Sequence, residues 1–483
     1  MKVFDVFRKF PRTFWVANSM ELFERWAYYG FFMLFANYLT MSTDTGALGF
    51  SQTQKGIIMA VGTAVLYLLP ILTGAIADRI GYKKTLFIAY ILYLLSFIIM
   101  PYCRSFMAVF MNYLFLAVGA AMFKPIVSAT VARTTDKDTS SIGFGIFYMM
   151  VNIGAFIGPL VALQFNETAF RMVFLISAVF ILLNMVILLF YKEPAKNVAE
   201  GGLGDAIMTI FRNIGIALSD RKFAVFLVIV AGFWTMYYQL FFSLSVFINQ
   251  WVDTSMVYNR IQHVFPWLIT AIGNSDGTIK AEYFTDIDAL YIILFQLIVS
   301  SIIMKWRPLN SMITGFIVAS VGMGLALMTA NGMFILAALF IFSLGEMAGS
   351  PKITEYIGRI APKDKVALYM GFSFLPIAIG NILAGIVAGP VYQQMTDKIS
   401  ILQREFASRG ISLPAFSEKF TKNDLVSKAC SDFGMTAKEL NHYLWDKYHP
   451  SHIWLVVTGI GLTASLALLL YDRFMLKSKE NGG

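Results

Sequence analysis

Three charges near the start of the chain are spaced so that they meet on one helix face. The segment is ELFERWAYYG, in which Glu21, Glu24 and Arg25 stand at positions i, i+3 and i+4. Residues three and four apart are neighbours on an α-helix. A carboxylate beside a cation stays ionised, but it takes up a proton when the pair opens into a drier cavity. The segment therefore predicts a group that binds and releases protons.

One lysine occupies a comparable position in another apolar stretch. Lys124, in the segment FKPIVS, stands about seven residues from the end of its stretch, which is roughly 10 Å at 1.5 Å of rise per residue. Glu21 and Glu24 lie at a similar depth from the same side, so we expect a Glu–Lys pair between two helices. The alternative is a static ion pair, which stabilises less than apolar packing.

Polar side chains in later apolar stretches could contact a solute. Glu346, in SLGEMAGSPK, could accept hydrogen bonds from an amine, or it could be neutral and bonded to a neighbouring helix. Asn152, in FYMMVNIGAFIGP, could act similarly or form a hydrogen bond between helices. Asp288 lies close to the end of its stretch, where a solvated helix end is the competing interpretation.

Other kinds of site have no support in the sequence. The four histidines, all in segments that we expect outside the membrane, are His263, His442, His449 and His452. This excludes a histidine proton carrier within an apolar stretch. The sequence has no CxxC or other metal-ligand pattern, no phosphate-binding glycine loop and no Ser–His–Asp arrangement. We therefore expect no enzyme, no metal site and no cofactor, with protons as the coupling ion.

A bundle of membrane helices must position these side chains. Hydrophobic residues make up 58% of the 483 residues and charged residues 14%, against roughly 25% charged in soluble domains. Apolar runs of about 18 to 25 residues can cross roughly 30 Å of hydrocarbon. We predict an all-α integral membrane protein with about twelve spanning helices in two groups of six. The predicted spans are 14–40, 55–78, 84–102, 106–131, 141–164, 170–191, 222–250, 286–305, 309–329, 332–358, 366–392 and 451–474.

Basic residues set the predicted orientation. They concentrate in alternate loops, for example at Lys83 and Lys84, which we expect to be cytoplasmic. Both termini are therefore predicted to be cytoplasmic. The net charge of +9 arises from these short loops rather than from one basic face, so we expect no nucleic-acid partner.

The order of these segments predicts two lobes. An N-terminal six-helix lobe at 1–191 is followed by a cytoplasmic linker with an amphipathic helix at 192–221 and by a C-terminal six-helix lobe at 222–483. The second lobe includes a polar, mostly helical extracellular insertion at 393–450, which is too long for a simple turn. Cys103 and Cys430 both fall on the outer side, and whether they pair is left open.

Several motifs resemble those of one transporter family. The loop motif between helices two and three of the major facilitator superfamily resembles the segment from Gly74 to Lys84, GAIADRIGYKK. The ExxERFxYYG motif of its proton-coupled oligopeptide (POT/PTR) family resembles ELFERWAYYG, in which Trp26 replaces the Phe. Signatures of the family's fifth, seventh, tenth and eleventh helices resemble GIFYMMVNIGAFIGP, FWTMYYQ, GEMAGSP and MGFSFLPIAIGNILAG. The matches run in order from residue 21 to residue 385.

The resemblance implies a divergent member of this family with the major facilitator fold. It also implies roles for the matching residues. The proton-coupling residues would be Glu21, Glu24, Arg25 and Lys124. The substrate-binding residues would be Tyr28, Tyr29, Tyr67, Lys124, Asn152, Tyr238, Asp288 and Glu346. The gating residues would be Asp78 and Arg79.

Two replacements distinguish this chain from the family pattern. Phe32 stands where the family commonly has an Arg that clamps the substrate carboxylate, and Tyr238 stands where it has an acidic residue. These replacements leave open whether ordinary dipeptides are carried.

The resulting expectation is a secondary active transporter, a proton-coupled symporter of di- and tripeptides that works by alternating access. The alternative solutes are other small amine-bearing compounds or modified peptides, and a receptor with a transporter fold is the less favoured class. The expected partners are the small-molecule or short-peptide substrate and the lipid bilayer. We expect a monomer in the cell membrane, with a bacterial plasma membrane favoured.

Overall fold

The computed structural model describes residues 9–136, 139–162, 164, 170–194, 208, 212, 215, 219–361, 369–370 and 372–476. These residues form helices joined by loops, with isolated β-bridges as their only β-structure. The amphipathic helix predicted within 192–221 lies largely outside the described residues.

Long apolar helices dominate the described part of the chain. Ten of them are long and apolar enough to cross a membrane, and α3 (Gln52–Leu68) with α4 (Pro70–Ile80) would make eleven if they form one bent span. The helix α2 (Arg12–Thr40) has 29 residues but is less apolar because it carries three charges in its middle. Each of the twelve predicted spans thus coincides with helical structure. The prediction of an all-α, multi-pass membrane protein is confirmed, and the side on which the termini lie stays a prediction.

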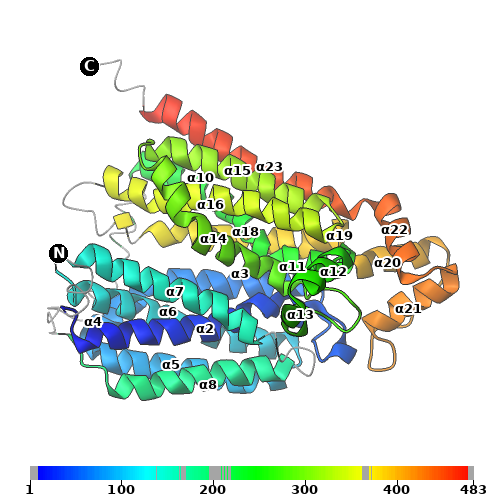
Figure 1. Ribbon diagram of the computed structural model, residues 1–483, viewed down its shortest axis with the longest axis horizontal. Helices are drawn as coiled ribbons and strands as arrows, with labels where there is room; N and C mark the ends of the chain where they lie inside the picture. The colour runs from blue at the N-terminus through cyan, green and yellow to red at the C-terminus, as the bar shows by residue number, and fades with distance from the viewer. Residues whose placement is uncertain are drawn as a thin grey trace. The chain divides into compact units, whose positions relative to one another are not determined.

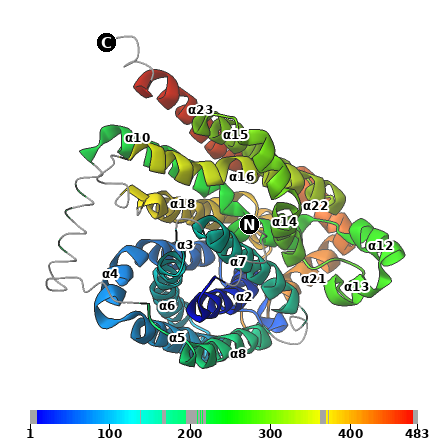
Figure 2. The same cartoon turned by 60° about the vertical axis from the view of Figure 1, so that its left-hand side comes forward.

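The first compact unit comprises residues 1–32 and 61–224. Its long helices are the first part of α2, the last part of α3, α4, α5 (Tyr82–Ile99), α6 (Phe106–Arg133), α7 (Ser140–Ala162) and α8 (Phe170–Leu189). In Figures 1 and 2, α2 lies among α5, α6, α7 and α8. The charged stretch of α2 is therefore enclosed by protein.

Two polar side chains of α8 hold it against α2. The Ser177 hydroxyl donates to the Ala27 carbonyl at 2.9 Å, and the Asn184 amide donates to the Met20 carbonyl at 3.0 Å. Such hydrogen bonds between helices satisfy side chains that have no water available inside a membrane.

Two glycines of α7 let it approach α2 closely. A Cβ atom at Gly154 would lie 2.5 Å from the Leu22 carbonyl oxygen, and one at Gly158 would lie 2.5 Å from the Trp26 carbonyl oxygen. Any larger side chain would collide with the α2 backbone, so the two helices pack through small residues. This contact explains the glycine spacing in GIFYMMVNIGAFIGP.

One predicted span is broken. We predicted a single helix at 55–78, but α3 ends at Leu68 and α4 begins at Pro70, and the two axes diverge by 49°. Proline lacks a backbone N–H and clashes with the preceding turn, so Pro70 favours a break at this position.

The second compact unit comprises residues 33–60 and 225–483. Its helices include α15 (Pro308–Met328), α16 (Gly332–Ile360) and α23 (Ile453–Leu470), which run side by side in Figures 1 and 2. The remaining spanning segments are α10 (Arg221–Tyr237), η4 (Leu240–Leu244), α11 (Ser245–Trp251), α14 (Glu282–Ile303), α18 (Leu375–Ile386), η6 (Val387–Val391), α19 (Tyr392–Met395) and η8 (Tyr471–Leu476). The segments η4, η6 and η8 are π-helical.

The ends of α2 and α3 pack in the second unit, although chain order puts them in the predicted lobe 1–191. The Asn37 amide donates to the Glu282 carboxylate at 2.6 Å, and the Lys55 ammonium donates to the Phe242 carbonyl at 2.7 Å. These buried contacts explain why the two compact units differ from the two lobes that were predicted from the order of the segments along the chain.

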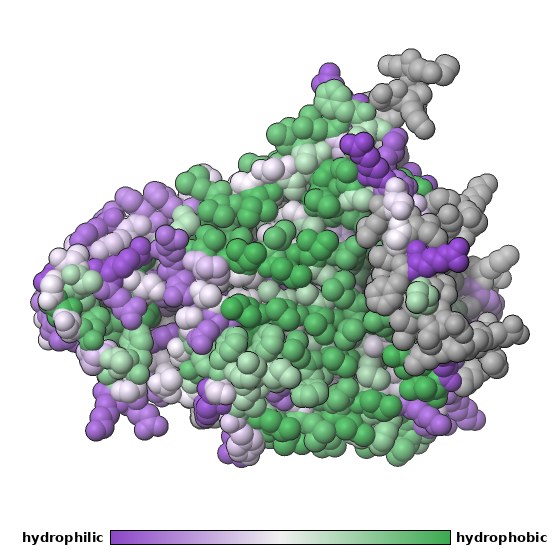
Figure 3. Space-filling view, turned by 180° about the vertical axis from the view of Figure 1, so that it is seen from behind, coloured by the Kyte–Doolittle hydropathy of each residue, from purple (hydrophilic) through white to green (hydrophobic). Residues whose placement is uncertain are grey.

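Short helices form the polar segments of the second unit. The segment 251–285, between two predicted spans, contains α12 (Ser255–Val264) and α13 (Pro266–Ile272). The insertion 393–450 contains α20 (Lys398–Ser408), α21 (Lys422–Phe433) and α22 (Ala437–Tyr448). Reciprocal capping boxes begin α21 and α22. Figure 3 shows hydrophilic residues over the insertion and a broad hydrophobic surface over the long helices. That hydrophobic surface suits contact with lipid.

Candidate functional site

The predicted charge cluster of α2 is present and buried. The Arg25 Nε atom lies 2.5 Å from Glu24 Oε2 and 3.3 Å from Glu21 Oε1. The three residues are between 0% and 5% exposed. Tyr93 of α5 donates its hydroxyl hydrogen to Glu24. Two carboxylates thus share one guanidinium, and one carboxylate oxygen, Glu21 Oε2, has no hydrogen-bond partner.

Aromatic rings cover the guanidinium. The Arg25 side chain lies 5.5 Å from the centre of the Tyr28 ring and 5.8 Å from that of Tyr29. Phe32 stacks on Tyr28 with ring centres 5.3 Å apart. Cations are attracted to aromatic faces at these distances. Tyr28 and Tyr29, two of the predicted substrate-binding residues, therefore lie next to the charge cluster, and Phe32 adds a further apolar ring beside Tyr28.

Lys124 lies against an aromatic ring, close to Glu21 but without a direct contact to it. Its ammonium sits over the Tyr67 ring, 4.3 Å from the centre, and among the described residues it forms no ion pair with Glu21 or Glu24. The described residues show no direct Glu–Lys ion pair, and Arg25 on the same helix engages both carboxylates, while Lys124 is close enough to Glu21 to act on its charge. The structure does join Lys124 and Tyr67, two predicted substrate-binding residues.

Asn152 bonds within its own helix. Its amide donates to the Tyr148 carbonyl one turn earlier, at 2.7 Å. Its side chain is only partly buried. The donor is thus engaged inside α7 rather than across to another helix.

The predicted gating residues sit at the end of α4. Asp78 pairs with Arg133 of α6 at 3.2 Å and accepts a hydrogen bond from the Tyr82 hydroxyl at 2.9 Å. Arg79 follows in the same turn. Sequence reasoning missed Arg133, whose only signal was its place at the end of a span on the same predicted side.

Two buried carboxyl groups meet in the second unit, and a third lies two residues away on α14. Asp288 of α14 accepts a hydrogen bond from Ser343 of α16 at 2.5 Å. Glu346, one turn further along α16, shares hydrogen bonds with Asp288 and with the Tyr237 hydroxyl. Asp286 is 1% exposed, and neither of its carboxylate oxygens has a hydrogen-bond partner. Asp288 and Glu346 are therefore brought together as predicted residues of one site, and Asp286 is an addition that the sequence did not suggest.

These acids form no ion pair with a described cation. Within the described residues, no lysine or arginine pairs with Asp286, Asp288 or Glu346. Burying an ionised carboxylate without a partner costs several kcal/mol, of the order of 5. A hydrogen bond between two carboxyl groups also needs a proton on one of them. The arrangement can therefore hold protons or accept a cationic group.

Tyr238 lies in an aromatic group rather than beside a charge. Its ring centre is 5.4 Å from that of Tyr237 and 6.0 Å from those of Trp234 and Phe241. It is 5% exposed. The replacement of an acidic residue by Tyr238 thus makes the turn directly after α10 aromatic instead of charged.

The described residues offer no metal site, since no group of three His, Cys, Asp or Glu side chains could hold an ion there. Cys103 and Cys430 are both free thiols.

Comparison with known proteins gives concordant matches. The family model of the Major Facilitator Superfamily matches residues 25–384. Dipeptide and tripeptide permease A of Citrobacter koseri is 22% identical over 84% of this chain and 90% of its own length. A di-/tripeptide transporter of Lactococcus lactis is 31% identical over 35% of this chain. The chain spans only 37% of that relative and 39% of an uncharacterized transporter, YclF, of Bacillus subtilis.

Solved structures share the fold over nearly the whole chain. A POT family transporter in complex with 5-aminolevulinic acid has a TM-score of 0.69 at 17% identity and covers 96% of this chain and 97% of its own. The peptide transporter POT in complex with sulfate has a TM-score of 0.68 at 17% identity, with 96% and 95% covered. At these identities the likeness concerns the fold.

Proposed function

Because the chain belongs to the Major Facilitator Superfamily, we propose that it is a proton-coupled symporter of small solutes with a positively charged amine, di- and tripeptides first among them. This is the superfamily that the motif from Gly74 to Lys84 predicted. Its members are transporters, so the chain is a transporter and not an enzyme. The peptide-transporting relatives and the POT neighbours are consistent with the predicted POT family.

Proton coupling rests on the buried cluster of α2. Glu24 is held by Arg25 and by the Tyr93 hydroxyl. A proton on Glu24 cancels its attraction to Arg25, which then keeps Glu21 as its only carboxylate partner. Uptake and release of that proton would thus switch the hydrogen bonds of α2 between two arrangements, as alternating access requires.

Substrate charge supports the same proposal. The acids Asp286, Asp288 and Glu346 lack a cation among the described residues, and a substrate ammonium would supply it. Lys124 faces Tyr67 and is engaged in no ion pair within the described residues. Lys124 would attract the substrate carboxylate, which Phe32 cannot do.

The decisive experiment is uptake of labelled Ala-Ala into proteoliposomes, with and without an inward proton gradient. We expect accumulation that depends on the gradient. Glu24→Gln removes the exchangeable proton with little change in shape, so it should abolish accumulation while counterflow exchange persists. Glu418→Gln, at an exposed site of the insertion, is the matched control and should accumulate normally. Full accumulation by Glu24→Gln would refute the coupling role.

A second candidate is transport of cationic solutes that lack a carboxylate. The three acids favour a positive charge, and Phe32 removes one half of the usual carboxylate clamp. Competition of Ala-Ala uptake by simple amines would support this candidate. Absence of uptake for every solute, with ligand binding retained, would instead favour a receptor. We propose a monomer in a bacterial plasma membrane as the working state.

A further inference from the structure

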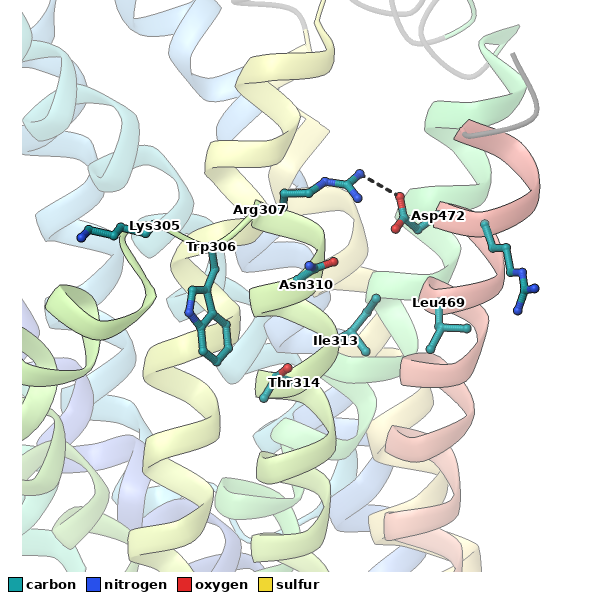
Figure 4. A pocket seen from close by; sticks show the side chains of 9 residues that line it. Lys305, Trp306, Arg307, Asn310, Ile313, Thr314, Leu469 and Asp472 are labelled. Atoms are coloured by element: carbon teal, nitrogen blue, oxygen red, sulfur yellow. Dashed lines mark hydrogen bonds and ion pairs between the residues drawn. The ribbon is translucent and has the colours of Figure 1, made fainter. Parts of the chain in front are cut away.

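Two segments far apart in the sequence line an open cavity of about 980 Å³ in the second unit. One segment is the loop from Lys305 to Arg307 with the first turns of α15, and the other joins α23 to η8. Because α15 and α23 lie side by side, the cavity sits where their ends meet (Figure 4). The sequence predicts this end to be cytoplasmic.

Positive charge dominates the mouth of the cavity. Arg307 reaches across it to Asp472 at 3.1 Å, and its side chain is still 55% exposed. Arg473 and Lys305 add two further positive charges, and within the described residues neither forms an ion pair. The lining thus carries three cations and one carboxylate, of which only Arg307 and Asp472 pair, and this net positive charge suits an anion.

The deeper part of the cavity is apolar. Ile313 of α15 faces Leu469 of α23 below the level of Arg307 and Asp472, while Asn310 points toward the space between them (Figure 4). Six residues of α-helix separate Ile313 from Arg307, which is about 9 Å along the axis. The cavity therefore grades from charged to apolar in the direction of the membrane interior.

Exposed apolar side chains surround the cavity. Met304 is 69% exposed, Phe474 65%, Leu470 43% and Trp306 41%. These side chains would meet hydrocarbon in a bilayer, and an indole ring is typical of the membrane–water interface. A molecule in this cavity would thus touch lipid on its open side.

We propose that this cavity binds the headgroup of an anionic phospholipid, with its phosphate at Arg307 and Arg473 and an acyl chain along Ile313 and Leu469. Basic pockets between membrane helices on the cytoplasmic side suit acidic headgroups. Free phosphate would use the same cations but would leave the apolar depth unfilled. The site is independent of the proposed substrate.

The test measures binding of phosphatidylglycerol and of phosphatidylcholine to the purified full-length protein by native mass spectrometry. We expect preferential binding of phosphatidylglycerol. Arg307→Gln should weaken that binding about fivefold, and Arg307→Gln with Arg473→Gln should weaken it further, since each cation near a membrane surface attracts anionic lipid. Asp472→Asn should strengthen it, because the competing carboxylate is gone. Arg359→Gln, at an exposed basic site on α16, should leave it unchanged.

Because Arg307→Gln should weaken lipid binding and Asp472→Asn should strengthen it, the two variants distinguish a lipid site from a purely structural ion pair. Arg307→Gln and Asp472→Asn break the same pair, so a purely structural role would make both variants equal. Equal binding of the two lipids, or equal effects of the two variants, would overturn the proposal. Thermal stabilisation by inorganic phosphate as large as that by phosphatidylglycerol would also overturn it, in favour of a free-anion site. If Arg307→Gln fails to fold, Asp472→Asn alone decides by the direction of its effect.

Discussion

The carboxyl groups of Asp286, Asp288 and Glu346 are buried, and within the described residues Asp288 accepts a hydrogen bond from Ser343 but none of the three pairs with a cation. A substrate ammonium would complete this site. Hydrogen bonds to charged groups contribute about 1.5–3 kcal/mol. We therefore expect Glu346→Gln to weaken the binding of amine-bearing substrates by roughly tenfold or more. The measurement is inhibition of labelled Ala-Ala uptake by unlabelled Ala-Ala and by its N-acetylated form, which lacks the charge.

The acetylated peptide serves as the internal control, because it should lose little affinity in Glu346→Gln. Glu355→Gln, two turns further along α16 and paired with Lys352 and Arg359, should behave as the unaltered protein. An equal loss for both peptides would remove Glu346 from the amine site.

Residue-level prediction succeeded where the chemistry lies within one helix. Glu21, Glu24 and Arg25 meet because their spacing alone puts them on one face. Prediction failed where the rotation of a second helix about its axis decides which side chains meet. The hydrogen bond from Tyr93 to Glu24 and the contact of Lys124 with the Tyr67 ring are the two examples. Depth along a span is readable from sequence, but the direction in which a side chain faces is not.

The packing of α7 on α2 depends on the absence of a single methyl group. A Cβ atom at Gly158 would lie 2.5 Å from the Trp26 carbonyl oxygen, which cannot move without disturbing α2. We therefore expect Gly158→Ala to destabilise the protein by about 1–3 kcal/mol, as overpacking does. It should also lower transport, since α2 carries the coupling cluster. Thermal unfolding in detergent and Ala-Ala uptake would measure both effects.

Gly145 on the same helix provides the matched control. A Cβ atom there would meet nothing within 4 Å, so Gly145→Ala should leave stability unchanged or raise it by up to about 1 kcal/mol, because alanine favours the helix. Equal unfolding temperatures for the two variants would contradict the close approach of α7 to α2.

At the level of elements, apolar length fixed the twelve spans because a membrane leaves few other structures for such segments. Their internal breaks were not readable. Pro70 separates α3 from α4, whereas Pro125 and Pro159 lie inside the unbroken helices α6 and α7. Since all three prolines lack the same N–H, the packing around each one decides whether the helix breaks.

At the scale of the whole molecule, α2 and α3 each belong partly to the first compact unit and partly to the second. Contacts that hold the ends of these two helices therefore matter for both units. The insertion supplies one such contact inside the second unit. The Lys422 ammonium donates to the Thr40 carbonyl at the end of α2, at 2.7 Å, and to the Phe50 carbonyl just before α3, at 2.9 Å. Burial lowers the pKa of Lys422, and the two hydrogen bonds offset part of that cost.

The insertion is therefore expected to fasten the turn between α2 and α3 rather than merely to cover the second unit. Lys422→Met keeps the length of the side chain but leaves both carbonyls without this donor, so we expect a loss of about 1–3 kcal/mol in stability. Lys419→Met, three residues earlier at an exposed site, removes the same charge and should have no effect. Thermal unfolding of both variants in detergent is the measurement. If Lys419→Met destabilised the protein as much, the loss would come from charge alone, and the fastening role of Lys422 would be refuted.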